Sequence, residues 1–181
     1  MAYEIIIKKG NLLNEDADFI VNASNTKLLL GSGVSMAFKR HCNKNLQNEM
    51  DTYLHTISKG ELNHGDVAIT SSCAYNFKYA IHTAVMNYNK GMRRKNKNPT
   101  LQTISDILYN IEKYLLLYAN ETKKPIKIVF PLMGCGVGGL SKIDVLNLYK
   151  EFFSKKIEIE CEVVIYGFNE DDYKMILEVM I

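Results

Sequence analysis

The protein has 181 residues, of which 47% are hydrophobic and 23% are charged, and its formal net charge is +2. This length and composition are typical of one globular domain, and no apolar run approaches the roughly 20 residues that a membrane-spanning helix needs. We therefore expect a single domain over residues 1–181 with no membrane anchor, and the small net charge argues against general nucleic-acid binding.

The first half of the chain contains four short runs that are apolar or rich in β-branched residues, and each predicts a strand. Between the second and third runs, two stripes of apolar residues at helical spacing predict two helices in tandem. The predicted strands are Tyr3 to Lys9, Phe19 to Ala23, Val67 to Ser71 and Tyr79 to Met86, and the predicted helices begin near Val34 and near Leu46, the second ending at Lys59-Gly60.

The second half continues the alternation of helices and strands. Apolar residues keep three-and-four spacing from Leu101 to Tyr118, which predicts a long amphipathic helix. Ile126 to Pro131 predicts a buried strand, and Ser141 to Asp144 fits the S-x-x-[DE] capping pattern at a helix start. Glu160 to Phe168 predicts a last strand and Tyr173 to Met180 a last helix. Such alternation predicts an α/β fold with helices on both faces of a sheet and a ligand site where the strands end.

The stretch from Phe19 to His41 combines a predicted strand, a polar elbow, the glycine loop Gly31-Ser32-Gly33 and a helix start. The first amide N–H groups of a helix have no internal partner and lie at the positive end of its dipole. A strand, a glycine loop and a helix in this order therefore predict an anion site, with phosphate as the leading ligand. For one G-x-G motif alone, a tight turn with close packing is the stronger alternative.

A second glycine loop, from Gly134 to Gly139, also follows a predicted strand and precedes a predicted helix. Two such loops in matching contexts favour phosphate binding over packing, and a diphosphate would fit between them. Neither loop matches the Walker pattern or G-x-G-x-x-G, so the common ATP and dinucleotide folds are not indicated.

The cysteines and histidines form no recognisable metal or redox motif. None of the four cysteines belongs to a C-x-x-C pair, and the four histidines build no ligand pair. The N-terminal sequence also lacks the features of a secretory signal. We therefore expect a reduced, cytoplasmic protein that holds no metal ion and no cofactor. The cysteines are Cys42, Cys73, Cys135 and Cys161.

A cluster of basic residues lies in a segment that has no apolar period and ends at a proline. A solvated, mobile loop is the first interpretation of this segment, and contact with phosphate or nucleic acid is the second. The basic residues are Lys90, Arg93, Arg94, Lys95 and Lys97.

Along nearly its whole length the sequence resembles a macro domain, the ADP-ribose-binding module. Each matching block is weak alone, but their combination and order are specific. The blocks are Gly10 to Leu12, Asp18 to Asn25 (DFIVNASN), Gly31 to Phe38 (GSGVSMAF), Gly65 to Thr70 (GDVAIT), Ile81 to Thr83 (IHT), Phe130 to Gly139 (FPLMGCGVGG) and Val163 to Phe168 (VVIYGF). The resemblance implies a three-layer α/β/α sandwich with a central mixed sheet, and ADP-ribose or an ADP-ribosylated substrate as the partner.

The resemblance also implies roles for individual residues. In macro domains the two glycine loops wrap the diphosphate with backbone amides, and the asparagine that matches Asn25 contacts the distal ribose. The aromatic residue of the last strand, here Tyr166 with Phe168 as the alternative, stacks on adenine. The implied ligand-binding residues are Asn11, Leu12, Ala23, Asn25, Gly31, Ser32, Gly33, Val34, Met133, Gly134, Cys135, Gly136, Val137, Gly138, Tyr166 and Phe168.

Several positions depart from the family pattern. Asn11 replaces the aspartate that reads adenine, so we expect weaker adenine selection. Ser35 stands where one hydrolytic branch has a water-activating aspartate, and Ala84 and Gly138 stand where another has its lysine and aspartate. A serine without a basic neighbour is a poor base.

Two functions therefore stay open. The chain either hydrolyses an ADP-ribosyl bond, with Asn25 and Ser35 as the candidate catalytic residues, or reads ADP-ribose without turnover. Recognition of ADP-ribosylated nucleic acid by the basic loop is a weaker alternative.

Overall fold

The computed structural model describes residues 2–42, 44–58, 60–91 and 96–181. Its strands are β1 (Tyr3–Lys9), β2 (Ala17–Asn25), β3 (Val67–Ser71), β4 (Phe77–Met86), β5 (Ile126–Phe130) and β6 (Cys161–Gly167). Its helices are the short 3-10 helix η1 (Leu12–Asn14), α1 (Gly33–His41), α2 (Lys44–Thr56), α3 (Leu101–Thr122), α4 (Lys142–Phe153) and α5 (Glu170–Met180). Every predicted element is present, whereas η1 was not predicted.

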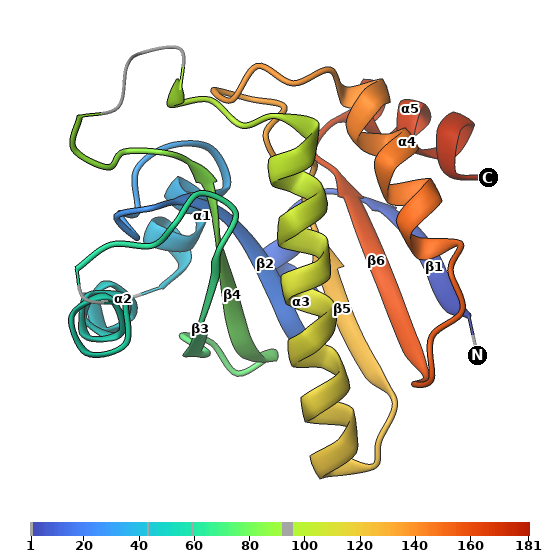
Figure 1. Cartoon of the computed structure of the whole chain (residues 1–181). Coiled ribbons are helices and arrows are strands. Elements are labelled where there is room, and N and C mark those ends of the chain that lie inside the picture. Colours follow the sequence, from blue (N-terminus) through green and yellow to red (C-terminus); the bar gives the residue numbers. More distant parts are fainter. Residues whose placement is uncertain (1, 43, 59, 92–95) are drawn as a thin grey trace.

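The strands form one six-stranded sheet in the order β1-β6-β5-β2-β4-β3 (Figure 1). β3 pairs with β4 in the antiparallel sense, and the other neighbouring pairs are parallel. The sheet is therefore mixed, as the resemblance to macro domains implies.

Helices cover both faces of the sheet, because successive side chains of a strand point to opposite faces. On β2, Val21 belongs to a core cluster with residues of α3, α4 and α5, and Ile20 belongs to a second cluster with residues of η1, α1 and α2. Both side chains are fully buried. The predicted three-layer α/β/α sandwich is confirmed.

Capping side chains explain where α4 and α5 begin. Ser141 accepts a hydrogen bond from the backbone N–H of Asp144, so the predicted capping pattern does start α4. Asn169 accepts in the same way from the N–H of Asp172 and starts α5 three residues before the predicted Tyr173. An asparagine cap stabilises a helix end by about 1 kcal/mol, and this cap was overlooked in the sequence.

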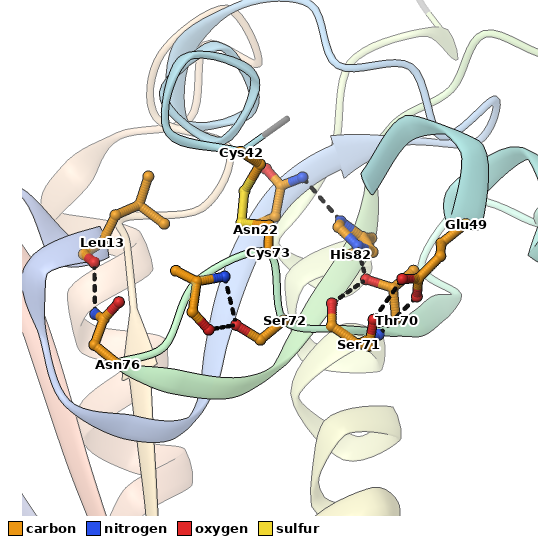
Figure 2. Close-up of a disulfide and its surroundings, with 11 residues drawn as sticks. Leu13, Asn22, Cys42, Glu49, Thr70, Ser71, Ser72, Cys73, Asn76 and His82 are labelled. Carbon is orange, nitrogen blue, oxygen red and sulfur yellow. Dashed lines mark hydrogen bonds between the residues drawn. A yellow bond between two sulfur atoms is a disulfide. The ribbon is translucent and has the colours of Figure 1, made fainter. Parts of the chain in front are cut away.

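Cys42 and Cys73 form a disulfide, with their Cα atoms 5.1 Å apart (Figure 2). The expectation of four reduced cysteines is therefore wrong for this pair, whereas Cys135 and Cys161 are free. Cys42 lies at the end of α1 and Cys73 in the turn between β3 and β4. They are 31 residues apart and meet only because α1 packs on the sheet, so no local spacing reveals the pair.

Two searches of the described residues bear on other function classes. None of the helices there is long and apolar enough to cross a bilayer. The same residues contain no group of three or more His, Cys, Asp or Glu side chains that could hold a metal ion.

Candidate functional site

The loops after β2 and β5 leave the sheet at the same end (Figure 1). The two strands are parallel neighbours, with Phe19 opposite Ile128 and Ile20 opposite Val129. The loop after β2 leads to α1, and the loop after β5 leads to α4. The fold thus brings both predicted glycine loops to one edge of the sheet.

The first glycine loop presents backbone amides to solvent. Gly31, Ser32 and Gly33 are exposed and Val34 is half-buried. Ser32 is the N-cap of α1, but its side chain makes no capping bond within the described part of the chain. The N–H groups of Gly33, Val34 and Ser35 begin the helix and so lack helical acceptors. Gly33 has a φ of 57°, which favours glycine. This helix start can bind an anion.

Asn25 shapes the segment that precedes this loop. Its Oδ1 accepts hydrogen bonds from the backbone N–H groups of Lys27 (3.1 Å) and Leu29 (3.2 Å), and its Nδ2 donates to the carbonyl oxygen of Leu29 (2.9 Å). The side chain is 6% exposed. The second N–H of the amide has no acceptor among the described residues, so one donor is left. Contact of Asn25 with a ribose stays a prediction.

Gln47 of α2 supports the same segment from outside, a role that sequence reasoning missed. Its Oε1 accepts from the N–H of Leu30 (3.1 Å), and its Nε2 donates to the carbonyl oxygen of Leu28 (2.9 Å). Leu28 has a φ of 51°, an uncommon conformation for a residue other than glycine, and is fully buried. Such strained backbone persists only where its surroundings hold it.

The second glycine loop is closed by its own backbone. The N–H of Leu140 donates to the carbonyl oxygen of Gly134 (2.9 Å), and the N–H of Gly139 donates to that of Gly136 (3.1 Å). The N–H groups of residues 135–138 have no acceptor within the described ranges. This loop therefore offers a second set of free amide donors beside the first.

Close packing fixes the shape of the second loop. A Cβ atom on Gly138 would lie 2.6 Å from the carbonyl oxygen of Gly134 and 2.9 Å from Cγ of Pro99, so this position requires glycine. Met133 is buried, and its N–H donates to the hydroxyl oxygen of Tyr149 (3.3 Å). Pro99 and Tyr149 are supporting residues that the glycine motif alone does not reveal.

Cys135 brings a neutral thiol to the second loop. Burial raises the pKa of this half-buried thiol to about 11, so it stays protonated near neutral pH. An anion bound at the loop would not meet a thiolate.

Below the first loop lies a buried polar network. The Ser35 hydroxyl lies 2.9 Å from Asn22 Oδ1 and 3.2 Å from the carbonyl oxygen of Ala23. Asn22 Nδ2 donates to His82 Nδ1 (3.0 Å), and His82 Nε2 lies 2.9 Å from Thr70 Oγ1 (Figure 2). Burial lowers the pKa of His82 to about 3, so the ring is neutral and, in this order of donors, carries its proton on Nε2.

This network joins α1 to β2, β4 and β3. Ser35 is 3% exposed and Asn22 and His82 are fully buried, so these side chains hold elements together. A catalytic role for Ser35 stays a prediction. The sequence signal for the others was available, because Asn22 and His82 are polar residues inside otherwise apolar strands.

The predicted adenine end of the site lies where β1 and β6 finish. Asn11 is exposed, and its Oδ1 accepts from the N–H of Leu13 (3.0 Å), which caps η1. The N–H of Gly10 donates to the carbonyl oxygen of Gly167 (2.9 Å) and so brings Asn11 beside the end of β6. Phe168, the next residue, is 82% exposed.

Tyr166 is placed differently from Phe168. Its ring is half-buried against the core beneath η1, and its hydroxyl donates to Glu15 Oε2 (2.6 Å). Burial opposes ionisation of Glu15, but hydrogen bonds from Lys127, Lys8 and Tyr166 outweigh it and lower the carboxyl pKa to about 2. Tyr166 is thus part of a charged cluster around the buried carboxylate of Glu15, whose lysines are partly exposed.

The remaining predicted contacts divide by burial. Leu12 is buried and Ala23 is half-buried. In the basic loop, Lys90 and Lys97 are exposed. Arg93, Arg94 and Lys95 lie outside the described residues, so the predicted phosphate or nucleic-acid contact of this loop stays a prediction.

Two clefts, of about 540 and 570 Å³, lie away from the glycine loops. Their walls come from α2, α3 and β3, with Tyr53 and Ile57 common to both. None of the predicted ligand residues lines either cleft. We place the candidate site at the loops, because binding of a phosphate depends on free donors more than on volume.

Comparison with known proteins agrees with this geometry. A family model described as "Macro domain" matches residues 21–149. An uncharacterised protein of Sulfolobus acidocaldarius is 31% identical over 91% of this chain and 84% of its own length.

Solved structures share the fold. A macrodomain mutant of Oceanobacillus iheyensis "with ADPR" is 23% identical, with a TM-score of 0.78, and the match covers 97% of this chain and 90% of that one. The Trypanosoma brucei macrodomain "in complex with ADP-ribose" is 22% identical, with a TM-score of 0.72, covering 97% and 68% of the two chains. The chain therefore belongs to the macro domain family.

Proposed function

We propose that residues 1–181 form one macro domain that binds ADP-ribose or an ADP-ribosyl derivative where β2, β5 and β6 end. One observation carries the proposal: the N–H groups at the start of α1 and those of residues 135–138 have no acceptors in the described structure and follow neighbouring parallel strands. A diphosphate offers acceptors to both sets. Two macrodomains of similar fold hold this ligand.

The rest of the ligand would extend to both sides of the diphosphate. Phe168 supplies an exposed ring for adenine beside Asn11, whereas the Tyr166 hydroxyl is already bound to Glu15. We therefore assign the stacking role to Phe168. On the other side, the free N–H of Asn25 can donate to a hydroxyl of the distal ribose.

Titration calorimetry tests this proposal. ADP-ribose and ADP should both bind, because both carry the diphosphate, and adenosine should bind at least about tenfold more weakly. ADP-ribose, ADP and adenosine all contain adenine, so Phe168→Ala should weaken the binding of each by roughly 1–3 kcal/mol, the cost of a lost stacking contact. Absence of ADP-ribose binding at high micromolar ligand overturns the proposal.

Binding without turnover is the function that these residues support best. Ser35 is buried and bonded to Asn22, and positions 31–35 and 133–139 contain no carboxylate and no lysine. Hydrolysis of an ADP-ribosyl bond is the second candidate, favoured by the remaining N–H of Asn25, which can orient a ribose or a water molecule.

Incubation with a mono-ADP-ribosylated protein and with an O-acyl-ADP-ribose ester separates these two functions. A reader leaves both substrates intact while binding ADP-ribose. Release of ADP-ribose that disappears in Asn25→Ala, with binding retained, would establish hydrolysis instead.

Contact with nucleic acid is a weaker alternative, favoured only by the exposed Lys90 and Lys97. Filter binding of ADP-ribosylated and unmodified DNA over a salt series tests it. A steep loss of affinity with salt indicates that several phosphates are neutralised, whereas weak, salt-insensitive retention excludes this function.

A further inference from the structure

The disulfide joins the helix of the first glycine loop to the turn between β3 and β4 (Figure 2). Cys42 is the C-cap of α1, and its N–H donates to the carbonyl oxygen of Phe38 (2.8 Å). The same helix begins at Gly33, where the free amides lie. The disulfide thus fixes the far end of the helix that presents those amides.

α1 depends on a few anchors for its position. It has nine residues, so it is about 13 Å long and would not be stable alone. The Phe38 ring is fully buried, Ser35 bonds to Asn22 near the helix start, and the disulfide holds the end. Because a helix is stiff, a movement of its C-terminal end at Cys42 also reorients the amides at its N-terminal end, at Gly33.

The turn that carries Cys73 is itself bound to the adenine end of the proposed site. Asn76 Nδ2 donates to the carbonyl oxygens of Leu13 and Glu15, both at 2.8 Å, and Leu13 lies in η1 beside Asn11 (Figure 2). On the other side of the turn, Ser71 binds the carboxylate of Glu49 in α2. Through the disulfide and the hydrogen bonds of Asn76, the turn therefore connects α1, at the phosphate end of the proposed site, with η1, at the adenine end.

We propose that the thiol–disulfide state of Cys42 and Cys73 controls the affinity of the glycine-loop site, with the oxidised form binding more tightly. This inference rests on the proposed binding of ADP-ribose. Coupling between two sites is typically 5- to 150-fold in affinity. We expect a loss of affinity of about fivefold on reduction, at the low end of this range, because the contacts of Phe38 and Ser35 still restrain α1.

The chemistry of the switch is thiol–disulfide exchange with a low-molecular-weight thiol. The external thiolate attacks Sγ of Cys73, because Cys73 is half-buried whereas Cys42 is only 7% exposed. The S–S bond breaks, and Cys42 leaves as a thiolate that takes up a proton. A second external thiol attacks the mixed disulfide and releases Cys73. Two electrons and two protons reach the protein, and the external thiols become a disulfide.

Calorimetry of the full chain with ADP-ribose, before and after treatment with dithiothreitol, tests the switch. Thiol titration of the denatured protein should count two thiols before treatment and four after it. The variant Cys42→Ser/Cys73→Ser is the matched control, because it cannot form the bond. Its affinity should equal that of the reduced protein and should not respond to dithiothreitol. Cys161 lies in β6, which β5 and β2 separate from β4 in the sheet, so Cys161→Ala should keep the full response.

The outcomes distinguish the switch from the binding function. Equal affinity of both forms, or four thiols before treatment, overturns the switch and leaves the proposed function standing. Absence of binding in both forms overturns the proposed function and the switch together. Circular dichroism of the reduced protein and of the double variant shows whether a loss of affinity is a loss of folding, which would also contradict the switch.

Discussion

The two glycine loops reach a similar arrangement of free amides by different means. The first is held by side chains from elsewhere in the chain, namely Gln47, Phe38 and the disulfide at Cys42. The second is held by its own backbone and by close packing of Gly138 on Pro99. The first loop should therefore be sensitive to changes far from the ligand, and the second to changes of its own residues.

The largest expected effect tests the distant support of the first loop. Cys42→Ser/Cys73→Ser opens a link between residues 31 apart, so the free energy of unfolding should fall by roughly 3 to 4 kcal/mol. Urea denaturation of the oxidised wild type and of the variant measures the change. Equal midpoints would show that the disulfide does not stabilise the folded chain.

The second test addresses the packed loop. In Gly138→Ala the new Cβ meets the carbonyl oxygen of Gly134, so the loop must shift, at about 1 to 3 kcal/mol of stability. Displaced amides should weaken ADP-ribose binding roughly 10- to 100-fold. Calorimetry and thermal unfolding measure the two effects.

Gly136→Ala is the matched control for this loop. Its Cβ would meet no atom within 4 Å, and its φ lies outside the left-handed region. The stability of this variant should stay close to that of the wild type. A loss of stability as large as that in Gly138→Ala would mean that close packing is not what shapes the loop.

The same contrast explains what the sequence could predict. The succession of helices and strands along the chain and the two glycine loops follow from apolar periods and glycine motifs, because those signals are local, whereas the mixed sheet is implied only by the resemblance to macro domains. Gln47, His82 and the cysteines of the disulfide contact residues that are distant in the sequence, and no local pattern indicates which residues these partners are. The resemblance favours Tyr166 as the adenine platform, and our proposal of Phe168 instead rests on the bond between Glu15 and the Tyr166 hydroxyl, which a residue type does not reveal.

A third test uses pH to probe the network beneath the first loop. The pKa of His82 is about 3 in the folded protein and 6.5 ordinarily, so below pH 6.5 the unfolded chain binds a proton that the folded chain does not. Titration of His82 leaves the stability unchanged well above pH 6.5. Between pH 6.5 and 5 it should lower the free energy of unfolding by roughly 1 to 2 kcal/mol. The carboxylate of Glu15, with its pKa lowered to about 2, stabilises the fold above about pH 4.5, and this stabilisation is lost only as the pH falls below that value, outside the range between pH 6.5 and 5. Denaturation curves across this range measure the slope.

His82→Gln provides the comparison for that slope. Glutamine can donate and accept hydrogen bonds but does not titrate, so the loss of stability between pH 6.5 and 5 should shrink markedly. A variant with the wild-type slope would show that other groups carry the pH dependence.

The smallest expected effect concerns Gln47, which touches the first loop but not the proposed ligand. Gln47→Ala removes the bonds to Leu28, Leu30 and Asp51 and should lower stability by about 1 kcal/mol in total, because Gln47 is half-buried and water can replace part of these bonds. ADP-ribose affinity should fall a few-fold, because Leu28 then has less support for its left-handed backbone. Gln47→Glu keeps an acceptor for the Leu30 N–H but sets a carboxylate oxygen against the Leu28 carbonyl oxygen and the Asp51 carboxylate, so it should destabilise the protein at least as much as Gln47→Ala. Unchanged affinity in Gln47→Ala would mean that the disulfide and Phe38 alone position the first loop, and the distant support would then reside in α1 rather than α2.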